Sequence, residues 1–191
     1  MAATCRSYDG AADFEAVGRF LVRTCRREGP HVNWLQPRWE YMHYHPLIRG
    51  VDVSRTGVWE DGGAIVAVAH PEHEVGTVYV EVDPDRPVAP QALLEYAGTC
   101  LSVAKAGVSR VGVFIHDRDV GFQRAAAAAG YVRTADCEDM TYLPIPSPFP
   151  DVSVPDGFRI RSLADDGDLR KTRRLLWRGF NHPGEPSEED V

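Results

Sequence analysis

Residues 31–46, HVNWLQPRWEYMHYHP, hold two tryptophans, two tyrosines and three histidines. Imidazoles can bind a metal ion, and aromatic rings can hold an amine by stacking or cation–π contact. A helix is predicted here, with Pro37 in its first turn and Pro46 beyond its end. One face of that helix would carry Trp34, Arg38, Tyr41 and His45. A metal site, an aromatic pocket and core packing are the three interpretations to compare.

The histidine spacing argues against a metal site. His43 and His45 are two residues apart, so on a helix their side chains point about 200° away from each other. His70 and His73 lie on either side of Pro71 in a predicted turn, and no cysteine pairs with a histidine at zinc-like spacing. The chain also lacks the GxSxG sequence of a serine hydrolase. We expect no metal, and the aromatic pocket and core packing stay open as alternatives.

The composition narrows the class of protein. The chain has 191 residues, of which 43% are hydrophobic and 26% charged, with a net charge of -7. A negative balance disfavours nucleic-acid binding. The four cysteines are far apart, as in a protein with reduced thiols, and the N-terminus does not resemble a signal peptide. No apolar run approaches the roughly 20 residues of a membrane helix. We expect a cytoplasmic protein without a membrane or nucleic-acid partner.

The hydrophobic pattern predicts an α/β domain. Helical spacing marks residues 11–27, 31–46, 89–107 and 120–130. Alternation or buried runs mark strands at 3–8, in a hairpin over 55–70, and at 75–84, 109–117 and 131–145. In the strand at 75–84, Val78, Val80 and Val82 point one way, while Thr77, Tyr79 and Glu81 point the other. Mixed elements in this order predict a sheet flanked by helices.

The end of the chain repeats its beginning. Residues 144–157 carry five prolines and are predicted to link a domain at 1–143 to a second one at 158–191. At an offset of 155, Arg6-Ser7 recurs as Arg161-Ser162, and Asp13-Phe14 as Asp168-Leu169. Residues 158–191 therefore read as the first strand and helix of a second repeat, incomplete here. The alternative is that any strand–helix unit resembles any other.

The element order resembles the GNAT superfamily of acetyl-CoA-dependent N-acetyltransferases. The resemblance rests on CRSYDGAADFEAVGRF, on VGTVYVEVDP as a fourth strand, and on GFQRAAAAAGYVRT as a late helix. It implies a GNAT-like fold, with a central mostly antiparallel sheet whose strands 4 and 5 splay apart. Acetyl-CoA would be the cosubstrate, with pantetheine in the gap and the pyrophosphate at the start of the third helix. Two such repeats in one chain would make a tandem GNAT protein.

The resemblance also assigns candidate residues. Pantetheine would lie along Val80 and Val82, and Arg86 and Gln91 would face the pyrophosphate. Glu81 is the candidate that deprotonates the amine; the alternative is that it faces outward and is solvated or salt-bridged. The acceptor pocket would be walled by Trp34, Arg38 and Tyr41, unless these residues only pack in the core.

Two departures from the family pattern affect positions that the family uses to bind or react with the cofactor. No glycine follows Arg86, and Pro87 and Pro90 each remove a backbone N–H from the turn that should bind phosphate. The late helix has Ala126 where the family often has a tyrosine that protonates the leaving thiolate. These departures favour a degenerate repeat that has lost acetyl-CoA binding; the alternative is that this repeat binds acetyl-CoA poorly or through other donors.

Three functions follow from the sequence. The first is an acetyl-CoA-dependent N-acetyltransferase, acting on an amine of a small molecule or protein, with this repeat degenerate. The second is a noncatalytic GNAT-like scaffold or regulatory domain for an active second repeat, in cis or on another chain. A small-ligand sensor is the third. An incomplete second repeat exposes apolar surface, so association, for example as a homodimer, is expected.

Overall fold

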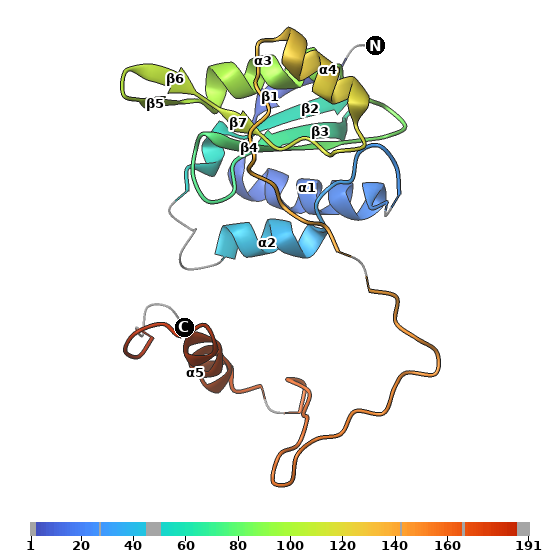
Figure 1. Ribbon diagram of the computed structural model, residues 1–191, viewed down its shortest axis with the longest axis vertical. Coiled ribbons are helices and arrows are strands. Elements are labelled where there is room, and N and C mark those ends of the chain that lie inside the picture. Colours follow the sequence, from blue (N-terminus) through green and yellow to red (C-terminus); the bar gives the residue numbers. More distant parts are fainter. Residues whose placement is uncertain (1–2, 27, 45–50, 142, 166, 187–191) are drawn as a thin grey trace. The chain divides into compact units, whose positions relative to one another are not determined.

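Five strands form the central sheet, in the order β1–β2–β3–β4–β7 (Figure 1). Neighbouring strands run antiparallel except β4 and β7, which are parallel. The predicted α/β class with a mostly antiparallel sheet is confirmed. The strand bounds are Thr4–Ser7 for β1, Gly57–Asp61 for β2, Ala64–His70 for β3, Thr77–Val82 for β4 and Gly112–Val113 for β7.

The computed structural model describes residues 3–26, 28–44, 51–141, 143–165 and 167–186. The chain divides into two units, Met1–Cys137 and Glu138–Val191. The sheet belongs to the first unit. No helix among the described residues is long and apolar enough to cross a membrane.

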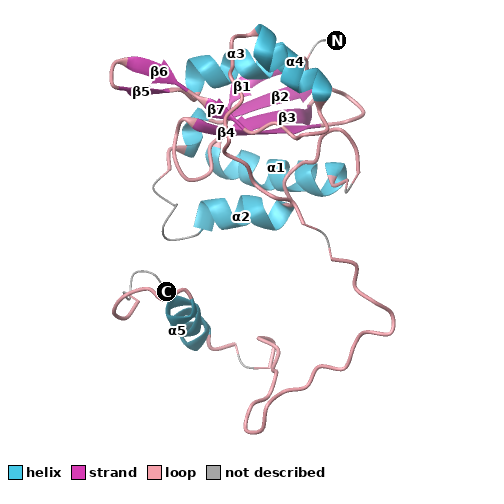
Figure 2. Ribbon diagram, viewed as in Figure 1, coloured by secondary structure: helices cyan, strands magenta, loops and turns pink. Residues whose placement is uncertain are grey.

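Helices cover both faces of the sheet (Figure 2). One face packs against α1 (Gly10–Thr24) and α2 (Gln36–Tyr44), and the other against α3 (Pro90–Cys100) and α4 (Val120–Ala128). The short 3-10 helix η1 (Val53–Arg55) precedes β2. Both faces of β4 are therefore covered, and most of its residues are buried. Val78 and Val80 contact the cluster under α3 and α4, while Tyr79 contacts the cluster under α1 and α2, as the alternation predicts.

Helix α1 forms where its apolar spacing predicts it. Val17 and Leu21 are fully buried, whereas Cys25 lies just past the last turn and is exposed. In the first turn, buried Asp13 accepts two hydrogen bonds from Arg6 of β1, at 2.5 and 2.7 Å. This charged pair fixes the start of α1 against the edge strand.

The predicted helix over residues 89–107 ends early. Helix α3 stops at Cys100, and the chain then forms a hairpin of β5 (Val103–Lys105) and β6 (Val108–Arg110). Ala106 and Gly107 make the turn, with φ of 53° and 76°. A two-residue hairpin turn of this kind needs positive φ, so cross-strand pairing here outweighs the helix preference of the alanines.

The strand predictions after α3 are largely wrong. Of residues 109–117, β6 takes the first two and only Gly112 and Val113 join the main sheet. No strand forms among the described residues of 131–145, where Tyr131 packs on the core but Val132 is 84% exposed. Three carboxylates crowd into residues 136–139, and acidic residues disfavour strands.

The described residues of the second unit contain one helix, α5 (Leu169–Gly179). Asp168 caps it by accepting the Lys171 N–H at 3.0 Å. The first strand predicted within residues 158–191 is not formed among the described residues, since a lone strand has no partner within this unit. The proline-rich residues 144–157 form neither helix nor strand. No residue of α5 is buried.

Candidate functional site

The edge of β4 is only half covered by its neighbour. Strand β7 pairs with Thr77 and Val78, and the last ladder bond runs from the Phe114 N–H to the Val78 carbonyl at 2.9 Å. Beyond this point the backbone groups of Val80 and Val82 face away from β3 and meet no strand. A strand edge of this kind offers donors and acceptors to any extended chain placed beside it.

Residues 31–33, here called the edge strap, occupy that open edge. The His31 Nε2 lies 2.9 Å from the Val80 carbonyl oxygen. The Asn33 carboxamide accepts the Val82 N–H at 2.9 Å and donates to the Val82 carbonyl at 2.8 Å. Asn33 therefore imitates the backbone amide of a neighbouring strand. Because it also donates to the Thr24 hydroxyl at 2.8 Å, the edge strap is anchored to α1 as well.

The edge strap also approaches the start of α4. The second ring nitrogen of His31 lies 3.7 Å from a carboxylate oxygen of Asp119, the residue that caps α4 by accepting the Phe122 N–H. Burial, with the nearby charges of Arg118 and His31, lowers the pKa of the neighbouring His116. The neutral form of His116 is therefore favoured at pH 7.

The turn that should bind phosphate is filled by internal ion pairs. Arg86 contacts the carboxylate of Asp83 at 3.3 Å, and Arg23 of α1 contacts it at 2.6 Å. Burial raises the pKa of Asp83, but the hydrogen bonds from Arg23, the Asp85 backbone and Arg86 outweigh it and lower that pKa on balance. Asp83 is thus a buried anion next to the predicted phosphate position. The guanidinium of Arg86 is bound to the Asp83 carboxylate.

Gln91, the other residue expected at the pyrophosphate, lies exposed in the first turn of α3. Pro90 opens this helix, so its first position offers no N–H.

Glu81 lies in the interior, not on the surface. It is 2% exposed, and its carboxylate accepts the Trp34 N–H at 2.7 Å and lies 3.3 Å from His70 Nε2. The other nitrogen of His70 donates to the Pro71 carbonyl at 3.0 Å, because that oxygen can only accept. The imidazole of His70 and the carboxylate of Glu81 are therefore within hydrogen-bond distance of each other in the interior. The alternative that Glu81 faces outward and is solvated is wrong, whereas the pairing that this alternative also allowed is found, with His70.

The structure joins two of the three predicted pocket residues. The Arg38 guanidinium carbon lies 4.1 Å from the ring centre of Trp34 and 4.9 Å from that of Tyr79. Arg38 also binds both carboxylate oxygens of Glu72, at 2.8 and 2.6 Å. Tyr41 is instead half exposed. Trp34 precedes α2 rather than lying on it, and His45 is outside the described residues.

Several residues of this region were missed from the sequence: His31, Asn33, His70, Glu72 and Tyr79. Tyr79 could have been found, because it shares a strand face with Glu81. The others lie in loops or at a strand end, and their partners are distant in sequence. Of the remaining histidines in the opening stretch, His43 packs beside Tyr8, and burial lowers its pKa.

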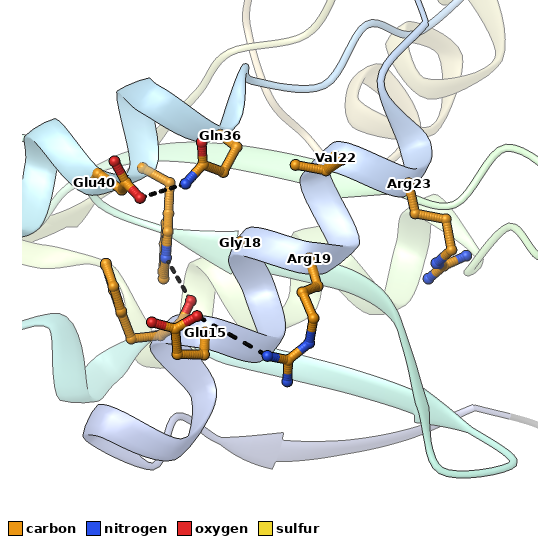
Figure 3. A pocket seen from close by; sticks show the side chains of 9 residues that line it. Glu15, Gly18, Arg19, Val22, Arg23, Gln36 and Glu40 are labelled. Atoms are coloured by element: carbon orange, nitrogen blue, oxygen red, sulfur yellow. Dashed lines mark hydrogen bonds and ion pairs between the residues drawn. The ribbon is translucent and has the colours of Figure 1, made fainter.

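A pocket lies elsewhere, between α1 and α2 (Figure 3). It has a volume of about 280 Å³, and its lining includes the apolar Phe14, Val22 and Trp39. Glu15 and Arg19 face each other across 4.0 Å at its rim. This groove is separate from the β4 edge and holds none of the predicted site residues.

No group of three or more His, Cys, Asp or Glu side chains in the described part of the chain could hold a metal ion. A scan against models of known protein families matches none of them, and a search of curated proteins returns no match. Function must therefore be inferred from the residues and their geometry.

Proposed function

We propose that the first unit is a noncatalytic GNAT-like domain. It would support acetyl transfer to an amine by a second repeat, in cis or on another chain, rather than bind acetyl-CoA itself. One observation carries the proposal: the β4 edge at Val80 and Val82 is already hydrogen-bonded to His31 and Asn33. Pantetheine would need these same backbone groups. A ligand would have to displace three hydrogen bonds to reach them.

The predicted phosphate end supports the same proposal. A pyrophosphate placed at the start of α3 would meet the buried carboxylate of Asp83, while Arg86 is held by that carboxylate. To bind a phosphate, Arg86 would have to leave its ion pair with this buried carboxylate, and breaking an ion pair in a partly buried site costs free energy. The loss of this pair and the missing N–H of Pro90 act together, so acyl-CoA affinity should be low.

A second candidate is acetyl transfer by this unit itself. It is favoured by the early end of the β4–β7 pairing and by Glu81, which lies on β4 beside His70. In that case the edge strap would move aside, and Glu81 would accept the proton of the amine.

Calorimetric titration of acetyl-CoA into the 191-residue chain separates the two candidates. The noncatalytic proposal predicts no saturable heat up to about millimolar ligand, where the binding free energy is only about -4 kcal/mol. It predicts the same for the Asn33→Ala variant, because opening the edge does not supply phosphate donors. Saturable micromolar binding by the unmodified chain would overturn it. In that event an acetyl-transfer assay on amines, with Glu81→Gln as the matched variant, would test the second candidate.

A further inference from the structure

We infer that Trp34, Tyr79 and Glu72 form a binding site for one guanidinium or ammonium group, and that the Arg38 side chain is its resident ligand. These three residues are called the cation cage below. The inference does not depend on the proposed function, since it concerns only the contacts around Arg38. It identifies the ligand by charge and shape, as a single cationic head group on an alkyl stem.

The cation cage combines the features that recognise organic cations. The rings of Trp34 and Tyr79 are 4.7 Å apart and tilted by 56°, and both present a face to the Arg38 guanidinium. A cation within about 6 Å of a ring centre is attracted by its negative face. Glu72 adds a carboxylate that meets the guanidinium in a two-point contact at 2.6 and 2.8 Å.

The walls of the cation cage are rigid, but its ligand is not deeply enclosed. Trp34 and Tyr79 are each 7% exposed and Glu72 is 4% exposed. Both rings pack on buried His70, at 4.5 and 6.0 Å, so their positions are fixed from behind. The Arg38 side chain is 35% exposed. The site therefore opens to solvent on the side from which Arg38 enters it.

This geometry explains why Arg38 is better described as a ligand than as a core residue. Truncating it would leave two aromatic faces and a buried carboxylate around a vacant space, with access from solvent. A free guanidinium has the planar shape and charge to fill that space. In the native chain the site is closed by its own side chain, so an external cation enters only when Arg38 leaves.

The test uses the whole 191-residue chain with Arg38→Ala and methylguanidinium chloride as the probe. Thermal unfolding is followed at increasing probe concentration, with sodium chloride at matched ionic strength. We expect a saturable rise in Tm of about 3 to 6 °C at about ten times the Kd. The unmodified chain should show no such rise, and neither should the Arg38→Ala/Glu72→Gln double variant.

The proposal is overturned if Arg38→Ala shows no saturable rise above the salt control. It is also overturned if the double variant responds equally. Should Arg38→Ala not fold in buffer, the native chain supplies an independent measurement by NMR. The Arg38 Nε–H proton should lie upfield of those of the other arginines because of the two ring currents, and Tyr79→Leu should reduce that shift. An ordinary position for this resonance would equally reject the cation cage.

Discussion

Glu81 and His70 form a buried polar pair between the sheet and the two helices that follow β1. Removing one member of such a pair leaves the other group buried without its partner. Glu81→Ala should therefore lower the free energy of unfolding by about 3 kcal/mol, because the Trp34 N–H and His70 both lose their contact. Glu81→Gln keeps an acceptor for Trp34 and should cost about 1 kcal/mol. Urea denaturation measures the free energy of unfolding of both variants. An equal loss in the two variants would contradict the burial of Glu81 against Trp34 and His70.

Asp13 links stability to pH at the start of α1. The hydrogen bonds from Arg6 lower the pKa of Asp13 in the folded state, and the donated Asp9 N–H adds to this against the opposing effect of burial. A lowered folded pKa means stability that is present above the unfolded pKa of about 3.9. That stability is lost as the pH falls through the lower folded value.

Asp13→Asn should therefore be less stable than the unmodified chain at pH 7, and its stability should fall less steeply below about pH 4. Urea midpoints measured between neutral and acid pH check both expectations. Glu15→Gln is the control, because this carboxylate lies on the same helix but is 71% exposed. A parallel acid response of the Asp13→Asn variant and the unmodified chain would show that Asp13 is not the group concerned.

The elements that were predicted correctly are those in which the spacing of apolar residues shows which side of the segment contacts the core. Helix α1 repeats its apolar residues at helical spacing, and β4 alternates between two buried faces. The hairpin of β2 and β3 is marked by Gly62 and Gly63. In each case the pattern along a short segment is enough, because one face of that segment contacts the core.

The failures concern contacts that local pattern does not contain. Asn33 is 49 residues away from Val82 in sequence, although its side chain accepts a hydrogen bond from the Val82 N–H. The residues near Asn33 in sequence therefore do not indicate that it will pair with a strand edge. The end of α3 was misplaced for a different reason. Ala104 and Leu101 keep helical spacing, yet residues 103–105 pair with 108–110 instead. Local hairpin pairing outweighs a weak helix preference there.

The β5–β6 turn gives a prediction at this scale. Ala106 has φ of 53°, a left-handed value that costs a residue with a side chain about 1–2 kcal/mol. Ala106→Gly removes this cost but increases the freedom of the unfolded chain, so the net gain in stability should be about 0.5–1 kcal/mol. Ala104→Gly, within β5, should instead be destabilising. Thermal unfolding of both variants shows whether each change raises or lowers stability. A lower stability of the Ala106→Gly variant would argue against the hairpin.

At the scale of the whole chain, the two units differ in how many of their apolar residues are buried. Both hydrophobic clusters are built from residues between Ala3 and Tyr131, so they are complete within the first unit. In the part of the second unit that the structure describes, one short helix forms with no buried residue, and Leu175 on it and Phe180 just after it are more than 70% exposed. Burial of apolar area is the main source of folding stability.

Shortening the chain to residues 1–137 should therefore leave a folded protein whose unfolding midpoint and near-ultraviolet circular dichroism match those of the full chain. The midpoint should agree within about 2 °C, which corresponds to less than about 1 kcal/mol for a domain of this size. A peptide of residues 158–186 should be only weakly helical in water, because an isolated helix of 11 residues is marginal. Should the shortened chain aggregate or unfold well below the full chain, the second unit would have to supply burial that the first unit needs, and the division after Cys137 would not mark an independent fold.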